Sequence, residues 1–341
     1  MGTDELNRTK ISGENSQECA EVDWQTAMKR AIRTTAELRL RLKLPASEEP
    51  AKLDFPTFVP LEFLARIEPG NEDDPLLRQV LPIADEFVDV PGFTADPVGD
   101  LNALPAAGVL HKYNRRALVI TTNACGVHCR YCFRREFPYS DRGSQSENWQ
   151  PSLDYIRRYT EIDEVILSGG DPLTLVDQKL FQLISQLESI PHVRRLRIHS
   201  RMPIVIPQRI TRPLVDRLRQ SRLATWMVVH ANHPAELDDQ VIGATDRLID
   251  AGIPVLNQAV LLRGVNDDPD VLEELCRKLA DHRVQPYYLH QLDRVRGAAH
   301  FEVPKKEGLG LIEQLRKRLP GYAVPNYVSE RAGEPSKSPI A

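Results

Sequence analysis

Between residues 106 and 320, short apolar runs alternate with amphipathic stretches. The apolar runs predict buried strands at residues 117–121, 164–167, 196–199, 225–230, 254–262 and 285–292. Helical spacing predicts helices at 178–190 and near 213–220, 234–251 and 269–282, the last with Asp268 as N-cap and Pro269 at its first position. Because each crossover helix returns the chain in the same direction, about six such repeats require a parallel sheet. Since six repeats are too few for the common closed barrel, we expect an α/β fold with an open or partial barrel.

The regions on either side have a different pattern. Residues 22–42 carry apolar positions at helical spacing and predict a helix that ends before Pro45. Prolines are dense from there to Pro105, so only short helices fit between them. We therefore expect residues 1–105 to form a helical, proline-rich layer that wraps a barrel of residues 106–320. A short C-terminal segment, residues 321–341, follows the barrel.

The charge balance favours a small-molecule partner. The 341 residues include 44 Lys and Arg against 48 Asp and Glu, so no basic excess would attract nucleic acid or anionic lipid. No apolar run approaches the ~18–20 residues that span a bilayer, and the first residues lack the apolar core of a secretory signal. We expect a cytoplasmic protein that binds neither nucleic acid nor membranes.

Three of the five cysteines, Cys125, Cys129 and Cys132, lie close together after the first predicted strand. An odd number of cysteines without an export signal disfavours a disulfide framework. Three thiolates suit an iron–sulfur cube, which then keeps its fourth iron open for a substrate or cofactor. A zinc site and a cluster of inert cysteines are the alternatives. Zinc needs a fourth ligand, and His128 stands between two of the cysteines, where it could not easily complete a tetrahedron.

Other residues with chemical potential also follow predicted strands. They are the turn Ser168-Gly169-Gly170-Asp171 and, after later strands, Arg201, His230 and Asp293. In such sheets, the loops at the carboxyl ends of the strands hold the ligands. We therefore expect these residues to converge at the ligand-binding edge of the sheet.

The spacing CxxxCxxC, with Tyr131 before the last cysteine, resembles the signature of radical S-adenosylmethionine enzymes. This resemblance implies a partial (β/α)6 barrel and a [4Fe–4S] cluster bound by Cys125, Cys129 and Cys132. It also implies S-adenosylmethionine on the open iron, cleaved by one electron to methionine and a 5′-deoxyadenosyl radical. The turn Ser168-Gly169-Gly170-Asp171 stands where these enzymes hold the methionine amino group. There the glycines would let the backbone approach the ligand closely, and Asp171 would balance the ammonium group.

Longer segments narrow the resemblance to the lysine 2,3-aminomutase family. They comprise residues 125–135, 201–211, 230–234, 257–266 and 286–293, and weaker similarity extends from Trp24 to Lys337. The resemblance implies an isomerase that converts L-lysine to (R)-β-lysine by hydrogen abstraction and 1,2-amino migration. It implies pyridoxal 5′-phosphate as a further cofactor, and an electron donor such as flavodoxin or ferredoxin.

The same resemblance implies roles for individual residues. Lys337, in the segment GEPSK, would be the catalytic lysine that holds pyridoxal phosphate covalently. Arg134 would pair with the substrate carboxylate, while Asp293 and Glu330 would hold the ε-ammonium group. The residues that would contact the cofactors are Ser168, Gly169, Gly170, Asp171, His230, Gln258, Lys112, Tyr113, Arg116 and Lys337.

Two of these positions depart from the family pattern. Lys112 stands in place of an arginine, so it keeps the charge but loses the bidentate fork. Glu330 stands in place of an aspartate, with a reach one methylene longer. Since both acids remain negative, a cationic side chain stays the expected substrate, and a glutamate substrate would be repelled.

The C-terminal sequence GEPSK resembles the short bacterial branch of the family, which makes (R)-β-lysine for modification of translation elongation factor P by a separate ligase. No cysteine follows Cys276, so we expect no structural zinc site. Two other interpretations remain open. A radical enzyme of another class, such as a methylthiotransferase or a glycyl-radical activase, would need no pyridoxal phosphate. A non-catalytic zinc-stabilised binding module would show no absorbance near ~400 nm after anaerobic reconstitution.

Overall fold

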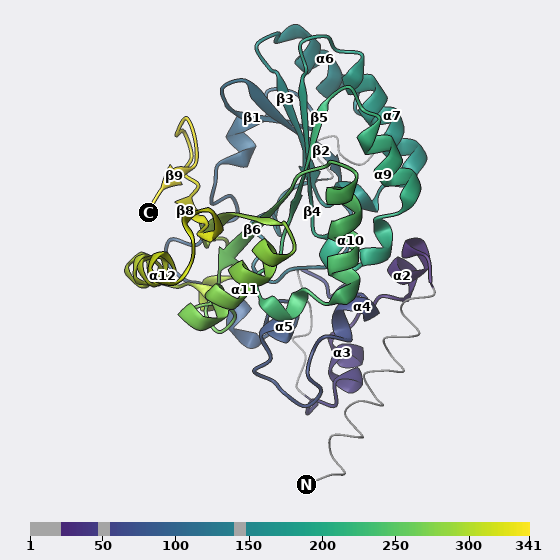
Figure 1. The fold of residues 1–341 in the computed structure, drawn as a ribbon. Helices are drawn as coiled ribbons and strands as arrows, with labels where there is room; N and C mark the ends of the chain where they lie inside the picture. Colours follow the sequence, from purple (N-terminus) through teal and green to yellow (C-terminus); the bar gives the residue numbers. More distant parts are fainter. Residues whose placement is uncertain (1–21, 47–54, 140–147) are drawn as a thin grey trace.

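A computed structural model describes residues 22–46, 55–139 and 148–341, and a single twisted sheet forms its centre (Figure 1). The sheet has nine strands in sequence order, from β1 to β9. Seven neighbouring strands are parallel: β2 (Arg116–Thr122), β3 (Glu164–Gly169), β4 (Arg195–Ser200), β5 (Ala224–Val229), β6 (Val255–Leu261), β7 (Gln285–Gln291) and β8 (Asn326–Ser329). Antiparallel strands β1 (Val109–Tyr113) and β9 (Ser338–Pro339) form its two edges. Because these edges do not pair within the described residues, the fold is a partial barrel.

In the described ranges, a helix of eight or more residues lies between each pair of consecutive parallel strands, and these helices cover the outside of the sheet (Figure 1). They are α6 (Gln150–Arg158), α7 (Asp177–Glu188), α9 (Arg212–Arg219), α10 (Asp239–Asp250), α11 (Pro269–Asp281) and α12 (Lys305–Arg318). The short helix α8 (Met202–Val205) precedes the longer one between β4 and β5. Helix α7 buries Leu180, Leu183, Ile184 and Leu187, the spacing of a single helix face. Asp268 caps α11 through the backbone N–H of Asp270, with Pro269 as the first residue, as predicted.

The six strands expected from the apolar runs are all present, and the predicted β/α repeat is confirmed. The sequence pattern did not predict helices α6 and α12 or strands β1, β8 and β9. Strand β8 is a seventh parallel strand, which α12 brings alongside β7. It matters for the site, because Glu330 directly follows β8 and Lys337 directly precedes β9.

The single helix predicted for residues 22–42 is wrong. Two helices occupy this stretch, α2 (Trp24–Arg30) and α3 (Thr35–Arg41), and Thr34 caps the second through the N–H of Glu37. Between them, Ile32 pairs with Val59 through two backbone hydrogen bonds of 2.8 and 3.0 Å. The chain leaves the helical conformation there because this bridge joins Ile32 to a later segment of the same layer.

The rest of the N-terminal layer follows the proline pattern. Its helices within residues 55–105 are each four residues long: α4 (Leu61–Leu64), α5 (Pro75–Arg78) and the 3-10 helices η1 (Ala84–Phe87) and η2 (Asp100–Ala103). Fully buried side chains such as Ile32, Phe63 and Leu76 belong to the same hydrophobic cluster as Val165 and Ile198 of the sheet. The layer therefore packs on the barrel instead of forming a core of its own. The boundaries at residues 105 and 320 stay predictions.

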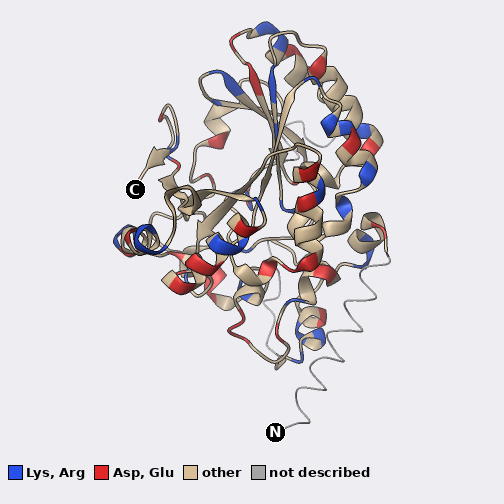
Figure 2. Cartoon of the chain, in the orientation of Figure 1, with Lys and Arg blue, Asp and Glu red and all other residues tan. Residues whose placement is uncertain are grey.

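Acidic and basic residues are interspersed over the outer helices (Figure 2). Within the described ranges, no helix has the length and apolar character needed to cross a bilayer.

Candidate active site

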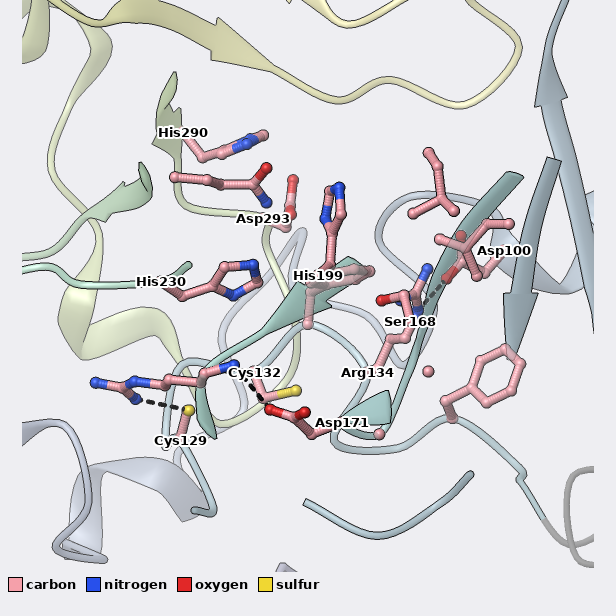
Figure 3. Close-up of a pocket in the computed structure, with 18 of the residues that line it drawn as sticks. Asp100, Cys129, Cys132, Arg134, Ser168, Asp171, His199, His230, His290 and Asp293 are labelled. Atoms are coloured by element: carbon pink, nitrogen blue, oxygen red, sulfur yellow. Dashed lines mark hydrogen bonds and ion pairs between the residues drawn. The ribbon is translucent and has the colours of Figure 1, made fainter. Parts of the chain in front are cut away.

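A cavity of about 740 Å³ opens inside the sheet, and every residue proposed from the sequence as a site residue lines it. These are Lys112, Tyr113, Arg116, Cys125, Cys129, Cys132, Arg134, Ser168, Gly169, Gly170, Asp171, His230, Gln258, Asp293, Glu330 and Lys337. Figure 3 shows Cys129, Cys132 and Asp171 on one side of this cavity, and His290 and Asp293 on the opposite side. Parallel strands bring residues from distant parts of the chain to one place because their carboxyl ends lie at the same edge.

The three cysteines occupy one loop after β2, and the N-terminal layer holds that loop in place. The N–H of Arg130 donates to the carbonyl of Gln79 at 2.8 Å, and the N–H of His128 donates to the carbonyl of Phe58 at 3.0 Å. The His128 ring stacks on Phe55, and its Nδ1 lies 2.9 Å from the carbonyl of Pro56. His128 is thus engaged by the layer and not by the cysteines, which leaves the zinc interpretation without support from this residue.

The electrostatics of the cysteines suit a metal cluster. Burial, with the neighbouring Cys132, raises the pKa of the Cys125 thiol well above its usual value. Burial, with Cys129, raises the pKa of Cys132 to about 11. The thiolates of Cys125 and Cys132 are therefore unfavourable without a nearby cation. Among the described residues, no group of three His, Cys, Asp or Glu is placed to hold a single ion. A cube takes one thiolate on each of three irons, so the residues fit an iron–sulfur cluster better than a lone ion.

The glycine turn after β3 packs directly against the cysteine loop. Gly170 donates its N–H to Thr122 at 2.8 Å, and Asp171 donates its N–H to Ala124 at 2.7 Å. A Cβ on Gly170 would lie 2.3 Å from the Ala124 carbonyl oxygen, and Gly169 has a φ of +113°. The two glycines are required for this backbone contact. Close approach of a ligand to them stays a prediction.

The Asp171 carboxylate is occupied by protein donors. It accepts hydrogen bonds from the Ser200 hydroxyl and from the N–H of Arg201, both at 2.7 Å. Burial raises its pKa, although these hydrogen bonds oppose the shift. Asp171 therefore joins the turn after β3 to the end of β4. The predicted role of Asp171 in balancing a ligand ammonium group does not follow from these contacts, so it stays a prediction.

At the other side of the cavity, two carboxylates surround Lys337. The pairing of Ser329 with Ser338 places Glu330 opposite Lys337, with the Lys337 Nζ 3.3 Å from a Glu330 oxygen. The same Nζ lies 3.3 Å from Nε2 of His290. Burial lowers the pKa of Lys337, while Glu330 and Asp293 oppose the shift. A lowered pKa favours the neutral amine that a nucleophilic lysine requires.

Asp293 follows β7 at the same end of the cavity. Burial, reinforced by the neighbouring Glu330, raises its pKa to about 7. Burial also opposes ionisation of Glu330, but Lys337 and Lys112 outweigh it and hold its pKa below the usual value. Two adjacent acids, one of them reluctant to ionise, form a site that a bound cation would stabilise.

Comparison with known proteins assigns the chain to a family. The model of the Radical SAM superfamily matches residues 119–276. The L-lysine 2,3-aminomutase of Escherichia coli (strain K12) is 46% identical over 323 residues, which are 93% of this chain and 94% of that protein. The chain belongs to the L-lysine 2,3-aminomutase family.

Other members and solved structures extend the comparison. The L-lysine 2,3-aminomutase of Haemophilus influenzae is 45% identical over 93% of this chain and 95% of its own length. That of Clostridium subterminale is 38% identical over 93% of this chain and 77% of its own length. The crystal structure of Streptococcus suis SuiB bound to S-adenosylmethionine matches 66% of this chain and 52% of that chain, with 14% identity and a TM-score of 0.47.

As a member of this family, the protein is a radical enzyme of the isomerase class. The radical SAM superfamily uses a [4Fe–4S] cluster and S-adenosylmethionine, and lysine 2,3-aminomutases are pyridoxal phosphate-dependent. The cavity fits groups of this kind, because several buried nitrogen atoms on its wall have no partner within the described residues. They are Nε of Arg116, Nε of Arg197, Nε2 of His199, Nε of Arg201 and Nε2 of His230. Buried polar atoms of this kind call for a ligand or water.

His199 and His230 are two neutral rings that converge in the cavity (Figure 3). Their centroids are 6.0 Å apart with the rings nearly perpendicular. Burial lowers the pKa of both, that of His230 to about 3. The side-chain amide of Asn257 holds the loop after His230 by bonding the N–H and carbonyl of Ala231 at 2.9 and 3.0 Å. Gln258, the next residue, faces the cavity.

Sequence reasoning missed Asp100, which lies in η2 of the N-terminal layer. Its Oδ2 accepts a 2.7 Å hydrogen bond from Nε of Arg134, and its Oδ1 lies 2.5 Å from Nζ of Lys112. Lys112 also donates to Glu330 at 2.8 Å. Burial opposes ionisation of Asp100, but Arg134 and Lys112 outweigh it and hold its pKa below the usual value. A chain of alternating charges therefore runs from Arg134 to Lys337.

Arg197 and His199 were missed as well, although a signal for them exists. Strand β4 alternates buried Leu196 and Ile198 with residues 197 and 199, which line the cavity. Alternation with period two places such residues on the opposite face of the strand. Polar residues at these positions therefore indicate that the inner face of the barrel is a binding surface. Asp100 has no comparable signal, because no motif or period surrounds it.

Proposed function

We propose that this enzyme converts L-lysine to (R)-β-lysine. The amino group moves from Cα to Cβ and one hydrogen moves in the opposite direction, so no atom is gained or lost. The names of the relatives and the residues of the cavity support this reaction. The main structural support for this reaction is that Asp293, Glu330 and Lys337 line the same cavity as the three cysteines.

Three groups would be held by residues of this chain. Cys125, Cys129 and Cys132 would ligate the [4Fe–4S] cluster, with S-adenosylmethionine beside the turn of residues 168–171. Lys337 would hold pyridoxal phosphate. When bound, these groups supply a hydrogen-abstracting radical and a ring that delocalises an unpaired electron.

The remaining residues orient the cofactors and substrate. Nε of Arg134 donates a hydrogen bond to Asp100, so its terminal nitrogens would bind the α-carboxylate of the substrate. One of these nitrogens, Nη1, lies 3.5 Å from the Ser168 hydroxyl. Lys112, Tyr113 and Arg116 would lie around pyridoxal phosphate, and His230 and Gln258 would contact cofactors from β5 and β6.

The acid pair selects the substrate. The ε-ammonium of lysine would replace the charge of Lys337 beside Asp293 and Glu330. A glutamate side chain would be repelled by both acids, so discrimination against it would come from charge rather than from shape. An arginine substrate carries the right charge, but its guanidinium is larger and planar.

We further propose that the product serves the modification of elongation factor P. The support is the C-terminal sequence GEPSK, which is similar to that of the short bacterial branch. The reaction would take place in the cytoplasm, and a flavodoxin or ferredoxin would deliver the electron. Incubation of the product with elongation factor P and its ligase should raise the mass of elongation factor P by one lysyl residue. An unchanged mass of elongation factor P would contradict this proposal and favour lysine catabolism as the use of the product.

The activity itself is tested by anaerobic reconstitution with iron, sulfide, pyridoxal phosphate, S-adenosylmethionine and dithionite. We expect L-lysine to give a product of unchanged mass with the chromatographic retention of (R)-β-lysine. L-arginine and L-glutamate, supplied separately, should react far more slowly. Faster rearrangement of either one would overturn the substrate assignment. The Lys337→Ala variant is the control, since a radical enzyme of another class would keep its activity and spectrum.

A further inference from the structure

Arg201 connects the cysteine loop with the glycine turn. It follows β4 directly and is 5% exposed. Its Nη1 donates a 2.8 Å hydrogen bond to Sγ of Cys129, and its backbone N–H donates to Asp171 at 2.7 Å (the dashed lines that end at Cys129 and Asp171 in Figure 3). The sequence placed Arg201 at a strand end but gave it no role. In the structure it is in direct contact with a residue proposed to ligate the cluster.

The other arm of the guanidinium is held rigidly. Nη2 donates to Gln79 at 2.6 Å and to Glu236 at 2.9 Å, and both acceptors are fully buried. The guanidinium carbon also lies 5.4 Å from the ring centroid of Phe63 and 5.7 Å from that of Tyr131. With hydrogen bonds at its edge and rings on its faces, the guanidinium cannot swing away from the sulfur without breaking several contacts at once.

This placement has an electrostatic consequence for a cluster bound to Cys129. Reduction adds one negative charge to the cluster, and a fixed cation beside a ligating sulfur stabilises the reduced form more than the oxidised form. Hydrogen bonds to the sulfurs act in the same direction. Glu236 offsets part of the charge, but it bonds the arm that points away from Cys129, so the donor nearest to the sulfur remains positive.

We propose that Arg201 raises the reduction potential of the iron–sulfur cluster through its hydrogen bond to Cys129. It is a positioning residue, since it acts through the cysteine and touches no substrate. Its effect would be to let a weak one-electron donor of the flavin or iron–sulfur class reduce the cluster. The inference rests on the proposed function in one respect, namely that Cys129 is a ligand of that cluster.

Two substitutions separate charge from hydrogen bonding. Arg201→Lys keeps the cation but cannot reach Cys129 and Glu236 together, and Arg201→Gln removes the charge while retaining an N–H donor. After anaerobic reconstitution, the midpoint potential of each protein is measured by redox titration with detection of the reduced cluster by electron paramagnetic resonance. We expect a more negative potential in both variants and a larger shift in Arg201→Gln. This signal reports only protein that carries a cluster, so reduced iron content does not hide a shift.

Arg66 offers a matched control. Its side chain is also largely buried (7% exposed), and the guanidinium carbon lies 5.4 Å from the Phe63 centroid. Arg66 also donates to the Glu236 carbonyl at 2.5 Å. Its other hydrogen bonds go to carbonyl oxygens of Glu62 and Ile204, so it shares the packing of Arg201 without the sulfur contact. We expect Arg66→Lys to lower the melting temperature and to leave the midpoint potential of the cluster unchanged.

The outcomes are distinct. Potentials in both Arg201 variants equal to that of the parent would overturn the inference, as would an equal shift in Arg66→Lys, which would indicate a general packing effect. Reduced turnover with a weak donor but parental turnover with dithionite would support it. If even the parent protein binds no [4Fe–4S] cluster, the proposed function itself fails, and this is read from its absorbance near ~400 nm before any titration.

Discussion

Two regions of one cavity are built in different ways. The cysteine region consists of Cys125, Cys129 and Cys132, which come from eight consecutive residues of one loop. The acid–lysine region consists of Asp293, Glu330 and Lys337. Asp293 follows β7, Glu330 follows β8, and Lys337 precedes β9. A short stretch of sequence contains all of the first region. The second exists only when three strands are in register.

Their surroundings differ as well. Behind the cysteine region, buried side chains such as Arg201, Gln79 and Glu236 form a closed hydrogen-bonded network. Lys112 links the acid–lysine region to Asp100, because it forms ion pairs with both Asp100 and Glu330. Glu330 also pairs with Lys337. The first region is thus preorganised by protein contacts. Under the proposed function, the second would exchange a protein cation for the substrate ammonium group.

The largest effect is expected from Cys129→Ser. A serine hydroxyl is a poor ligand for iron, so the variant should lose the cluster absorbance near ~400 nm and all activity. The pyridoxal phosphate spectrum should persist, because Lys337 lies in the other region. Iron analysis and absorbance spectra check both statements. Loss of both cofactors together would show that the two regions are not independent.

Lys337→Ala gives the reciprocal test. Removing the amine should abolish activity and the absorbance of covalently bound pyridoxal phosphate, while iron content stays at the parental level. Lys179→Ala, on the surface of α7, is the matched control and should retain both. Full activity of Lys337→Ala would contradict the assignment of the catalytic lysine.

Asp293→Asn tests the acid pair. Truncating one partner of a buried charge interaction costs about 2–5 kcal/mol, so kcat/KM for L-lysine should fall by roughly 30-fold or more. The rise in KM should account for much of the loss, because the ammonium is bound before the reaction begins. Steady-state kinetics with L-lysine measures both constants. Unchanged kinetics would mean that the ε-ammonium binds elsewhere.

Asp100→Asn should have a smaller effect. It removes the charge that holds Arg134 and Lys112, and a hydrogen bond to a charged group contributes about 1.5–3 kcal/mol. We expect kcat/KM to fall roughly tenfold or more, with Asp100→Glu less affected because it keeps the carboxylate. Equal kinetics in Asp100→Asn and the parent would remove Asp100 from the site.

The smallest effect concerns pH. Since the pKa of Asp293 is about 7, this acid is largely protonated below that pH and cannot balance an ammonium group. Raising the pH ionises it, so KM for L-lysine should fall by at most about tenfold per pH unit up to pH ~7 and level off above pH ~8. Asp293→Asn should lose this dependence. A KM that is flat between pH ~6 and ~8 in the parent would contradict the raised pKa.

Much of this arrangement could be predicted from short-range patterns. The six apolar strands, the cap of α11 and the cysteine loop depend on residues within a few positions of one another, and the structure has them where they were expected. The prediction of a single helix across residues 22–42 was wrong because a long-range contact interrupts it. Its interruption depends on the pairing of Ile32 with Val59, a contact that no local period encodes.

The order of the amino acids already contains the reactive groups of the site: three clustered thiolates, a lysine in GEPSK and acids at positions 293 and 330. How these groups pair follows from the folding of the chain. Lys112 meets Glu330 across 218 positions, and Arg201 meets Cys129 across 72. Ion pairs and hydrogen bonds act over a few ångströms, so the partners of a charged residue depend on how strands and layers pack, which no spacing along the chain records.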